Sequence, residues 1–199
     1  MVAFLVVDCR MVAHSLGHKH MNANRAVFLD LNGTLVLPLK QETLKEMYLI
    51  PGADAAIQRL LALGFLCPVV TIQARIEKGL FSEQDFLEWF KEFFGKHGLD
   101  VKGPYVCPHR FSNPCACKKP SPLLYERAAR DLDLNLSQSF VVGDSLEDVK
   151  AAIAFGGTGC LVRTGWAADD RIAEAARSIA PFIGPSVVEA ADWIIARKR

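Results

Sequence analysis

The chain has 199 residues, 51% of them hydrophobic and 23% charged, and a formal net charge of +1 at pH 7. This composition is typical of a globular protein that buries one core, and the near-neutral charge does not favour nucleic acid or an anionic membrane as a partner. No apolar stretch reaches the roughly 18–20 residues of a membrane-spanning helix, so such a span is excluded.

Residues 1–20, MVAFLVVDCRMVAHSLGHKH, start with an apolar run that Asp8 and Arg10 interrupt, and no basic residue precedes it. This is a poor secretory signal, and we expect a cytoplasmic protein. We interpret the segment as an N-terminal extension without fixed structure, followed by a single folded domain over residues 21–199. A metal-binding tract is the alternative, formed by His14, His18 and His20.

Strands and helices alternate along the first half of the chain. Residues 26–30 (AVFLD) are a short apolar run, typical of a strand buried on both faces of a parallel sheet. Residues 51–64 (PGADAAIQRLLALG) have one apolar face at helical spacing and end in a glycine. Residues 65–71 (FLCPVVT) return to strand character, although Pro68 cannot donate a hydrogen bond to a sheet.

The clearest helix spans residues 82–98, SEQDFLEWFKEFFGKHG. Ser82 and Asp85 have the spacing of a capping box. Aromatic residues follow at helical spacing, and we expect them to pack in the core rather than bind a cofactor. They are Phe86, Trp89, Phe90, Phe93 and Phe94.

The alternation continues in the second half of the chain. Short apolar runs predict strands at 103–107, 139–144 and 159–163, and helical patterns cover 121–132, 146–155 and most of the remainder. Strands that alternate with such helices build right-handed βαβ units and a parallel sheet covered on both faces. We therefore expect an α/β fold with three layers, a Rossmann-like parallel sheet between two layers of helices.

Residues 107–120, CPHRFSNPCACKKP, follow neither period, and a loop this long is usually functional or held by something other than a core. Three thiolates and one imidazole within it suit a closed, tetrahedral Zn²⁺ site. The ligands would be Cys107, His109, Cys115 and Cys117. We expect structural zinc in the loop 107–117, with an unmetallated loop as the alternative. A zinc-ribbon nucleic-acid module would need paired C-x-x-C knuckles and a basic face, which this pattern lacks.

Polar residues stand at the carboxyl ends of three predicted strands. Asp30 follows VFL, Thr71 follows PVV and Asp144 follows FVVG. In open α/β sheets the ligand site lies at this edge, where the strand order reverses. Two carboxylates there suit Mg²⁺, which prefers oxygen ligands, and a metal together with Lys119 could neutralise a phosphate.

Four segments resemble, in chain order, the motifs of the haloacid dehalogenase (HAD) phosphohydrolases: FLDLNGTLV, VVT, KKP and VVGDSLEDV. The resemblance covers residues 25–165, and the CPH and CAC segments resemble the zinc-bearing branch, which holds heptose-bisphosphate and histidinol-phosphate phosphatases. The resemblance implies a HAD-type core with a small zinc loop and no large cap domain. It also implies that Asp30 lies near the centre of the sheet, beside the strand of Asp144.

The resemblance further implies roles for the residues at the strand ends. Asp30 would attack phosphorus and form an aspartyl-phosphate, as carboxylate nucleophiles can. Mg²⁺ would be held by Asp30, Asp144 and the backbone carbonyl of Asn32. Thr71 would donate a hydrogen bond to the phosphoryl group and Lys119 would balance its charge, so that positioning and electrostatics carry the reaction.

Two departures from the family pattern bear on activity. Asn32 stands where relatives have the Asp that acts as acid and base, and an amide cannot carry a proton near pH 7. Such catalysis is worth roughly 10²–10⁴-fold, so we expect intact binding with slow turnover. Residues 71–79, TIQARIEKG, stand where relatives read approximately TNQSGIARG, which changes the substrate pocket at Ile72, Ala74 and Arg75.

The sequence features divide between two substrates. KGLFSEQDF (78–86) resembles the heptose-bisphosphate branch, whereas the short gap between the two pairs of zinc candidates resembles the histidinol-phosphate branch. Gln73, Lys118 and Arg163 are the candidate substrate-binding residues. Lys118 and Arg163 would either hold a distal phosphate or be solvated surface charges.

Asp148 has two interpretations. Some relatives place this position near the metal. Its spacing from Ser145 is also that of a capping box, and we favour the cap.

The leading interpretation is a Mg²⁺-dependent phosphatase that acts on a small phosphorylated sugar or alcohol. The alternatives are a pseudo-phosphatase that binds a phosphoester or a partner with little turnover, and an active enzyme that carries Asn32 as an introduced substitution. We expect a monomer whose partner is a small phosphorylated metabolite, not nucleic acid or a membrane.

Overall fold

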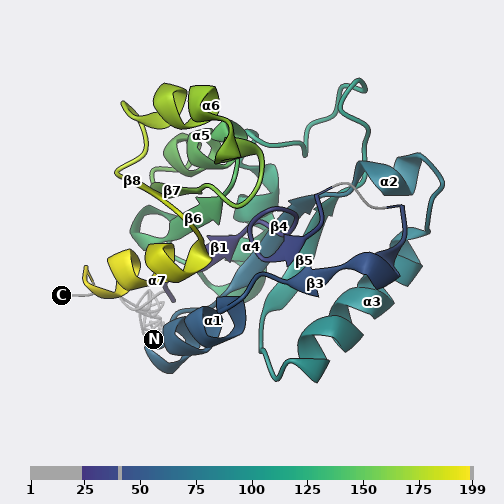
Figure 1. Cartoon of the computed structure of the whole chain (residues 1–199), viewed down its shortest axis with the longest axis horizontal. Helices are drawn as coiled ribbons and strands as arrows, with labels where there is room; N and C mark the ends of the chain where they lie inside the picture. Colours follow the sequence, from purple (N-terminus) through teal and green to yellow (C-terminus); the bar gives the residue numbers. More distant parts are fainter. Residues whose placement is uncertain (1–23, 40–41, 198–199) are drawn as a thin grey trace, which may run out of the picture.

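The structure is a computed structural model that describes residues 24–39 and 42–197. The expected extension over residues 1–20, with its histidines, lies outside the described residues. Figure 1 shows a central sheet with helices packed around it. The predicted three-layer α/β architecture is confirmed. Within the described ranges, no helix has the length and apolar character needed to cross a membrane.

Six parallel strands form the main sheet in the order β5-β4-β1-β6-β7-β8. In chain order they are β1 (Val27–Leu29), β4 (Pro68–Ile72), β5 (Lys102–Cys107), β6 (Phe140–Gly143), β7 (Thr158–Val162) and β8 (Phe182–Gly184). The chain runs outward from β1 to β5, returns to β6 on the other side of β1, and runs outward again to β8. The strand order therefore reverses at β1 and β6, the place where open α/β sheets bind ligands.

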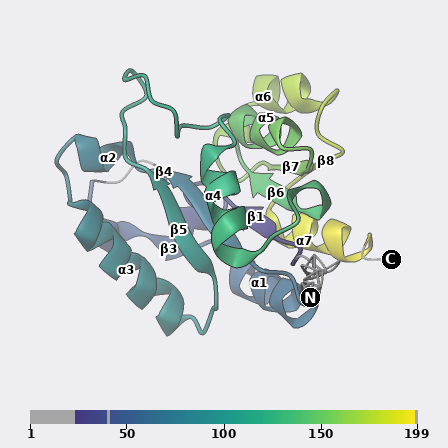
Figure 2. The ribbon, with the colours of Figure 1, turned by 180° about the vertical axis from the view of Figure 1, so that it is seen from behind.

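Helices bury both faces of β1. Val27 and Leu29 belong to one buried cluster and Phe28 to another, because alternate residues of a strand face opposite sides. The first cluster includes residues of α1 (Ala53–Ala62), α3 (Glu83–Lys96) and α7 (Val187–Ile195). The second includes residues of α4 (Leu123–Leu132) and α5 (Leu146–Ala154), and α6 (Asp170–Ala176) packs on α5. The view from behind in Figure 2 has α4 in front of the sheet.

The features predicted for individual elements agree with the structure. Pro68 is the first residue of β4, where a missing donor is tolerated. The capping box of α3 is present, since the Asp85 N–H donates to Ser82 Oγ at 3.0 Å and the Ser82 N–H donates to Asp85 Oδ2 at 2.9 Å. The aromatic stripe of α3 packs in the core, with three rings buried and two partly buried against them.

Some elements do not follow from the sequence patterns. Strand β8 lies in the C-terminal part of the chain, most of which is predicted helical, and no strand is predicted there; as an edge strand it pairs with β7 alone. A second, antiparallel pair is formed by β2 (Val36–Leu37) and β3 (Tyr48–Leu49). The short helical pieces are α2 (Ala74–Glu77), η1 (Leu44–Glu46), η2 (Leu136–Gln138) and η3 (Trp166–Ala168).

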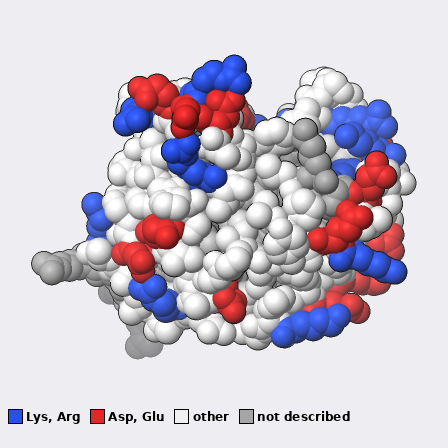
Figure 3. Space-filling model, viewed as in Figure 1, with Lys and Arg blue, Asp and Glu red and all other residues white. Residues whose placement is uncertain are grey.

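Charged side chains of both signs are interspersed on the face in Figure 3, mostly towards the edge of the view.

Candidate active site

The carboxyl ends of β4, β1 and β6 meet at a cavity of about 740 Å³. Asp30 follows β1, Thr71 lies near the end of β4, Asp144 follows β6, and all three side chains are buried. Asn32 and Lys119 line the same cavity. The structure thus brings the predicted catalytic and Mg²⁺-binding residues together, because β1 lies between β4 and β6.

Lys119 is held between two carboxylates. The side chain is only 5% exposed, and its amine donates to Asp30 Oδ1 and to Asp148 Oδ1, at 2.6 Å each. Asp148 Oδ2 meanwhile accepts from the Ser145 hydroxyl at 2.6 Å and from the Ser145 N–H at 3.3 Å. The predicted cap is therefore present, and the same carboxylate also reaches the cavity, close to where the alternative interpretation of Asp148 places it.

Gly143 lets Asp148 take this position. A Cβ at Gly143 would lie 2.1 Å from Asp148 Cγ, so a side chain there would displace the carboxylate. The glycine of the VVGD segment is the sequence signal that could have indicated the contact.

Three buried carboxylates surround one buried amine, so the cavity holds an excess of negative charge. Burial raises the pKa of Asp30 to about 6, although Lys119 opposes the shift. Burial together with repulsion from Asp30 and Asp148 raises the pKa of Asp144 to about 8. Burial alone would lower the pKa of Lys119, but Asp148 and Asp30 outweigh it and raise that pKa. A divalent cation would relieve this repulsion, and the oxygen donors present fit Mg²⁺.

Backbone encloses the Asp144 carboxylate. The Trp166 N–H donates to Asp144 Oδ2 at 2.7 Å. A Cβ at Gly33 would lie 2.4 Å from that oxygen, and a Cβ at Gly165 would lie 1.8 Å from it. Main chain from the loops after β1 and β7 therefore lies directly against the carboxylate, as a small cation site built partly from backbone would require.

Asn32 is hydrogen-bonded on one side only. Gln73 Nε2 donates to Asn32 Oδ1 at 2.7 Å and to Thr71 Oγ1 at 3.1 Å. Arg75 Nη1 donates to Gln73 Oε1 at 3.1 Å, and Arg75 Nη2 donates to the Leu39 carbonyl at 2.6 Å. Asn32 Nδ2 is buried and has no hydrogen-bond partner among the described residues.

The side chains of the three candidate substrate-binding residues are all engaged by other groups of the protein. Gln73 is fully buried behind Asn32. Lys118 lines the cavity, but its amine donates to the carbonyls of Arg110 at 2.6 Å, Phe111 at 3.1 Å and Asn113 at 2.7 Å. Arg163 lies at a different cavity, of about 1360 Å³, and bonds to the Ala167 carbonyl and the Asp170 carboxylate. A distal-phosphate role for Lys118 and Arg163 stays a prediction, and in this structure both side chains bond to protein groups instead.

The four zinc candidates converge in the cysteine loop, residues 107–117. Their ligand atoms all lie within 4.8 Å of one another. Cys115 Sγ lies 3.7 Å from Cys107 Sγ and 3.8 Å from Cys117 Sγ, while His109 Nδ1 lies 3.7 and 3.3 Å from the sulfurs of Cys107 and Cys117. A tetrahedron with metal–sulfur bonds of about 2.3 Å has edges of about 3.8 Å, so the spacing fits Zn²⁺.

Glu77 joins α2 to the cysteine loop. Its carboxylate accepts from the Arg110 N–H and, at 2.5 Å, from Asn113 Nδ2, while the Glu77 N–H donates to the Pro108 carbonyl at 3.3 Å. The Arg110 N–H is the main cause of a lowered pKa at Glu77. The loop is thus held by hydrogen bonds as well as by its cysteine cluster.

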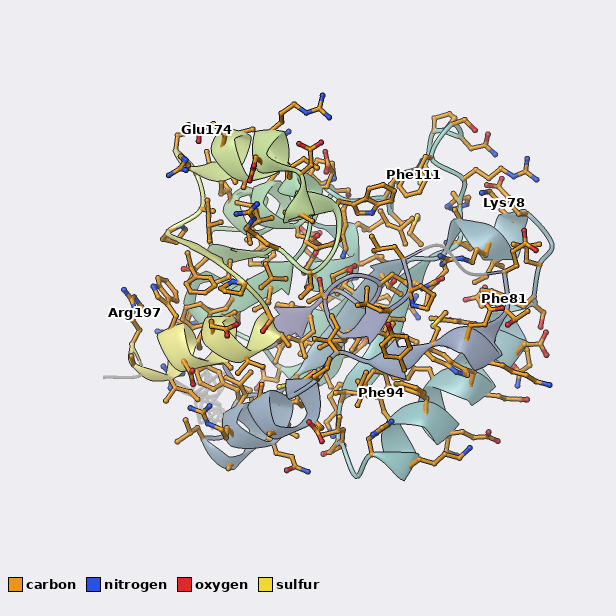
Figure 4. The ribbon with its side chains drawn as sticks, in the orientation of Figure 1. Lys78, Phe81, Phe94, Phe111, Glu174 and Arg197 are labelled. Atoms are coloured by element: carbon orange, nitrogen blue, oxygen red, sulfur yellow. The ribbon has the colours of Figure 1, made fainter. Side chains whose placement is uncertain are left out.

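Two exposed aromatic residues stand at the mouth of the cavity. Phe111 is 71% exposed and Trp166 is 47% exposed, and both line the cavity. Figure 4 shows Phe111 projecting from the cysteine loop on the side toward α5 and α6. Ile72 and Leu146 add apolar surface to the lining. The floor of the cavity is therefore charged and its mouth is largely apolar.

Comparison with known sequences identifies relatives. Residues 116–190 match a family model described as HAD-hydrolase-like. The chain is 36% identical over 152 residues to D-glycero-beta-D-manno-heptose-1,7-bisphosphate 7-phosphatase of Yersinia pestis, covering 70% of this chain and 81% of that protein. It is 33% identical over 182 residues to the protein of the same name in Escherichia coli K12, covering 85% and 87%.

Solved structures agree with this match. The crystal structure of D,D-heptose 1,7-bisphosphate phosphatase from B. bronchiseptica, complexed with magnesium and phosphate, superposes with a TM-score of 0.74 at 26% identity. That superposition covers 87% of this chain and 99% of the other. The corresponding protein of Burkholderia thailandensis, at 22% identity and a TM-score of 0.63, shares the fold.

Proposed function

The chain belongs to the HAD superfamily of phosphatases, among relatives named heptose-bisphosphate phosphatases, and on that premise we propose that it is a Mg²⁺-dependent phosphomonoesterase for a small phosphorylated sugar or alcohol. The observation that carries the proposal is the buried contact of Lys119 with Asp30, beside Asp144, in a cavity at the strand-order reversal.

The metal site would consist of the carboxylates of Asp30 and Asp144 and the backbone carbonyl of Asn32. Support comes from the excess negative charge of the cavity and from the solved relative that contains magnesium and phosphate. When bound, Mg²⁺ would neutralise negative charge on the phosphoryl oxygens.

The chemical step would use Asp30 as the nucleophile. One of its oxygens accepts from Lys119, and the other would attack phosphorus while the bond from phosphorus to the ester oxygen breaks. The product alcohol would take its proton from water, because the Asn32 amide cannot transfer a proton near pH 7. Water would then attack the aspartyl-phosphate, releasing inorganic phosphate and restoring the Asp30 carboxylate.

Lys119 and Thr71 would orient the phosphoryl group. The Lys119 ammonium keeps Asp30 ionised and offsets the charge of the incoming phosphate. Thr71 Oγ1 already accepts from Gln73, so its own O–H is left to donate to a phosphoryl oxygen.

Asn32 would make turnover slow. The leaving oxygen departs without a proton donor, and the attacking water lacks a base, which together forfeit roughly 10²–10⁴-fold in rate. A second candidate function is a pseudo-phosphatase that binds a phosphoester with little turnover. The buried Asn32 Nδ2, a donor without a partner in the described chain, favours it.

The cavity mouth bears on the substrate. Phe111 and Trp166 offer aromatic faces against which the apolar face of a sugar ring could stack. Both described lysines of the lining are already engaged, Lys119 by carboxylates and Lys118 by carbonyls. A phosphorylated sugar therefore fits, as in the named relatives, and a second phosphate would find no uncommitted lysine of the lining.

The cysteine loop would carry structural Zn²⁺ with four protein ligands and no open position. Such a site needs reduced thiols, which a reducing compartment such as the cytoplasm maintains. We expect the protein to act there as a monomer.

Phosphate release measured with Mg²⁺, for the unsubstituted chain and for Asn32→Asp, tests the proposal. The panel would hold heptose bisphosphate, histidinol phosphate, sugar monophosphates and an aryl phosphate. A rise of about 10²-fold or more in Asn32→Asp supports a phosphatase limited by its missing acid. Binding of phosphoesters by both forms without release would favour the pseudo-phosphatase, and neither binding nor release would overturn both.

A further inference from the structure

The hydrogen-bonded chain from Arg75 through Gln73 to Asn32 has one direction. A guanidinium has donors and no acceptor, so the group facing Arg75 Nη1 must be the oxygen of Gln73. Gln73 Nε2 then faces Asn32 and must meet its oxygen, Oδ1, at 2.7 Å. The arginine thereby fixes the orientation of both amides, and Asn32 Nδ2 is turned away from Gln73.

Asn32 Nδ2 is a buried donor, unpaired within the described residues, on a residue that lines the cavity. Asp30 and Lys119 line the same cavity. Buried donors are almost always paired in folded proteins, so a ligand oxygen is the partner that the position calls for. An anion with unprotonated oxygens, such as a phosphate group, has the required acceptors.

We propose that Arg75 and Gln73 are positioning residues that hold the Asn32 amide as a donor to a phosphate oxygen. The proposal rests on the proposed function, because it takes the cavity to be a phosphoryl site. It also accounts for two departures from the family pattern together: Asn32 supplies the donor, and Arg75, where relatives read glycine, sets its direction. The site would hold phosphate more firmly than a carboxylate at residue 32 would, at the expense of proton transfer.

The arginine could instead act in two simpler ways. Its positive charge attracts phosphate at a distance, and its contact with the Leu39 carbonyl anchors the loop after β2. Neither effect depends on Asn32. A double-mutant cycle on Arg75 and Asn32 therefore separates positioning from both, since only positioning couples the two residues.

The test measures binding of inorganic phosphate by titration calorimetry at saturating Mg²⁺, on the full chain. Asn32→Ala should weaken binding about tenfold or more, as loss of a hydrogen bond to a charged oxygen does. Arg75→Met should weaken binding about threefold to fivefold in the natural chain and by less than about twofold in the Asn32→Ala background. The control is Arg171→Met, which removes an exposed arginine paired with Asp169 and should leave affinity unchanged.

A second substitution keeps the proposal testable if the Arg75 variant misfolds. Gln73→Leu removes the hydrogen bonds that link Arg75 to Asn32 and leaves the Arg75 contact with the Leu39 carbonyl in place. Its effect on phosphate affinity should depend on Asn32 in the same way as that of Arg75→Met. In ¹⁵N-labelled protein, the side-chain amide signal that Asn32→Ala removes should shift on phosphate addition in the natural chain and lose that response in Arg75→Met.

The outcomes are distinct. If Arg75→Met and Gln73→Leu each reduce phosphate affinity by the same factor with Asn32 present and in the Asn32→Ala background, the positioning role is overturned. The proposal that the cavity binds phosphate would be unaffected. Absence of phosphate binding by the natural chain with Mg²⁺ would overturn the proposed function itself.

Discussion

The Lys119 amine lies 2.6 Å from one oxygen of Asp148, while the other oxygen of Asp148 caps the helix that begins at Leu146. One carboxylate therefore fixes the start of α5 and also orients the cation that contacts Asp30. The helix and the reaction site share a residue, and a change at Asp148 should register in both stability and turnover.

Asp148→Asn should lower the free energy of unfolding by about 2 kcal/mol, because a buried hydrogen bond between charged groups is lost and the cap of α5 is weakened, while Lys119 keeps its pair with Asp30. Urea unfolding at pH 7 measures this. The matched control is Asp131→Asn, which breaks an exposed pair with Arg127 and should change stability by less than about 1 kcal/mol. Equal effects of the two substitutions would contradict the role given to Asp148.

The purified chain should contain one Zn²⁺, and Cys117→Ser should lose it, because a closed site needs all four ligands. Metal analysis after dialysis measures the content. Cys160→Ala removes a buried cysteine outside the cluster and should retain the metal. A Cys117→Ser protein with full zinc content would rule out the proposed ligand set.

Lys118→Met should loosen the cysteine loop rather than change the choice of substrate. The Lys118 amine donates to three carbonyls of that loop, so its loss should speed zinc transfer to a chelator severalfold. The ratio of kcat/KM for a bisphosphate to that for a monophosphate should stay within about twofold, since uniform changes cancel in such a ratio. A selective loss with the bisphosphate would instead support Lys118 as a phosphate-binding residue.

Without Mg²⁺, the protein should lose stability as the pH rises from about 4 to about 8. The folded state keeps a proton on Asp144, whose pKa is raised to about 8, while the unfolded chain releases it near its ordinary value of 3.8. Asp30, at about 6, adds to the same trend. The contribution is fully present below the unfolded pKa and is lost as the pH passes through the folded one.

Thermal unfolding of the zinc-loaded protein in Mg²⁺-free buffer, repeated with Mg²⁺, measures both parts of this prediction. Mg²⁺ should raise Tm more at pH 8 than at pH 5, because the ligands must be ionised to bind. Asp144→Asn should flatten the pH trend and remove most of the Mg²⁺ effect. A Tm that rises from pH 5 to 8 in Mg²⁺-free buffer would be the contrary result.

The sequence predicts the sheet well where apolar runs are long or bounded by glycine. The runs that end in Asp30 and Asp144 are strands, and parallel strands bring their carboxyl ends to one edge, so the meeting of these residues follows from topology. The two-residue strands β2 and β3 are too short to show a period, and the pattern of β8 does not stand out from the helical patterns around it.

Side-chain direction is the part that the sequence does not specify. Gln73 matches the family pattern, yet it faces Asn32 rather than the cavity, because its amide is committed to Arg75 and Asn32. Lys118 has a long side chain, and three nearby carbonyls satisfy its amine better than open solvent-facing positions would. The direction of such side chains depends on residues that are distant in sequence but close in space, or that lie in the same irregular loop.

The position of β1 has a consequence for biosynthesis. The strand pairs with β6 along its whole length, yet some 110 residues of chain separate the two, so a nascent chain exposes one hydrogen-bonding edge of its central strand until β6 has left the ribosome. Asp30 likewise has no ion-pair partner until Lys119, in the second half of the chain, has been synthesised, and Asp148 follows later still. We expect fragments that stop before residue 140 to need a chaperone to stay in solution, and no partly synthesised form to have a complete phosphoryl site.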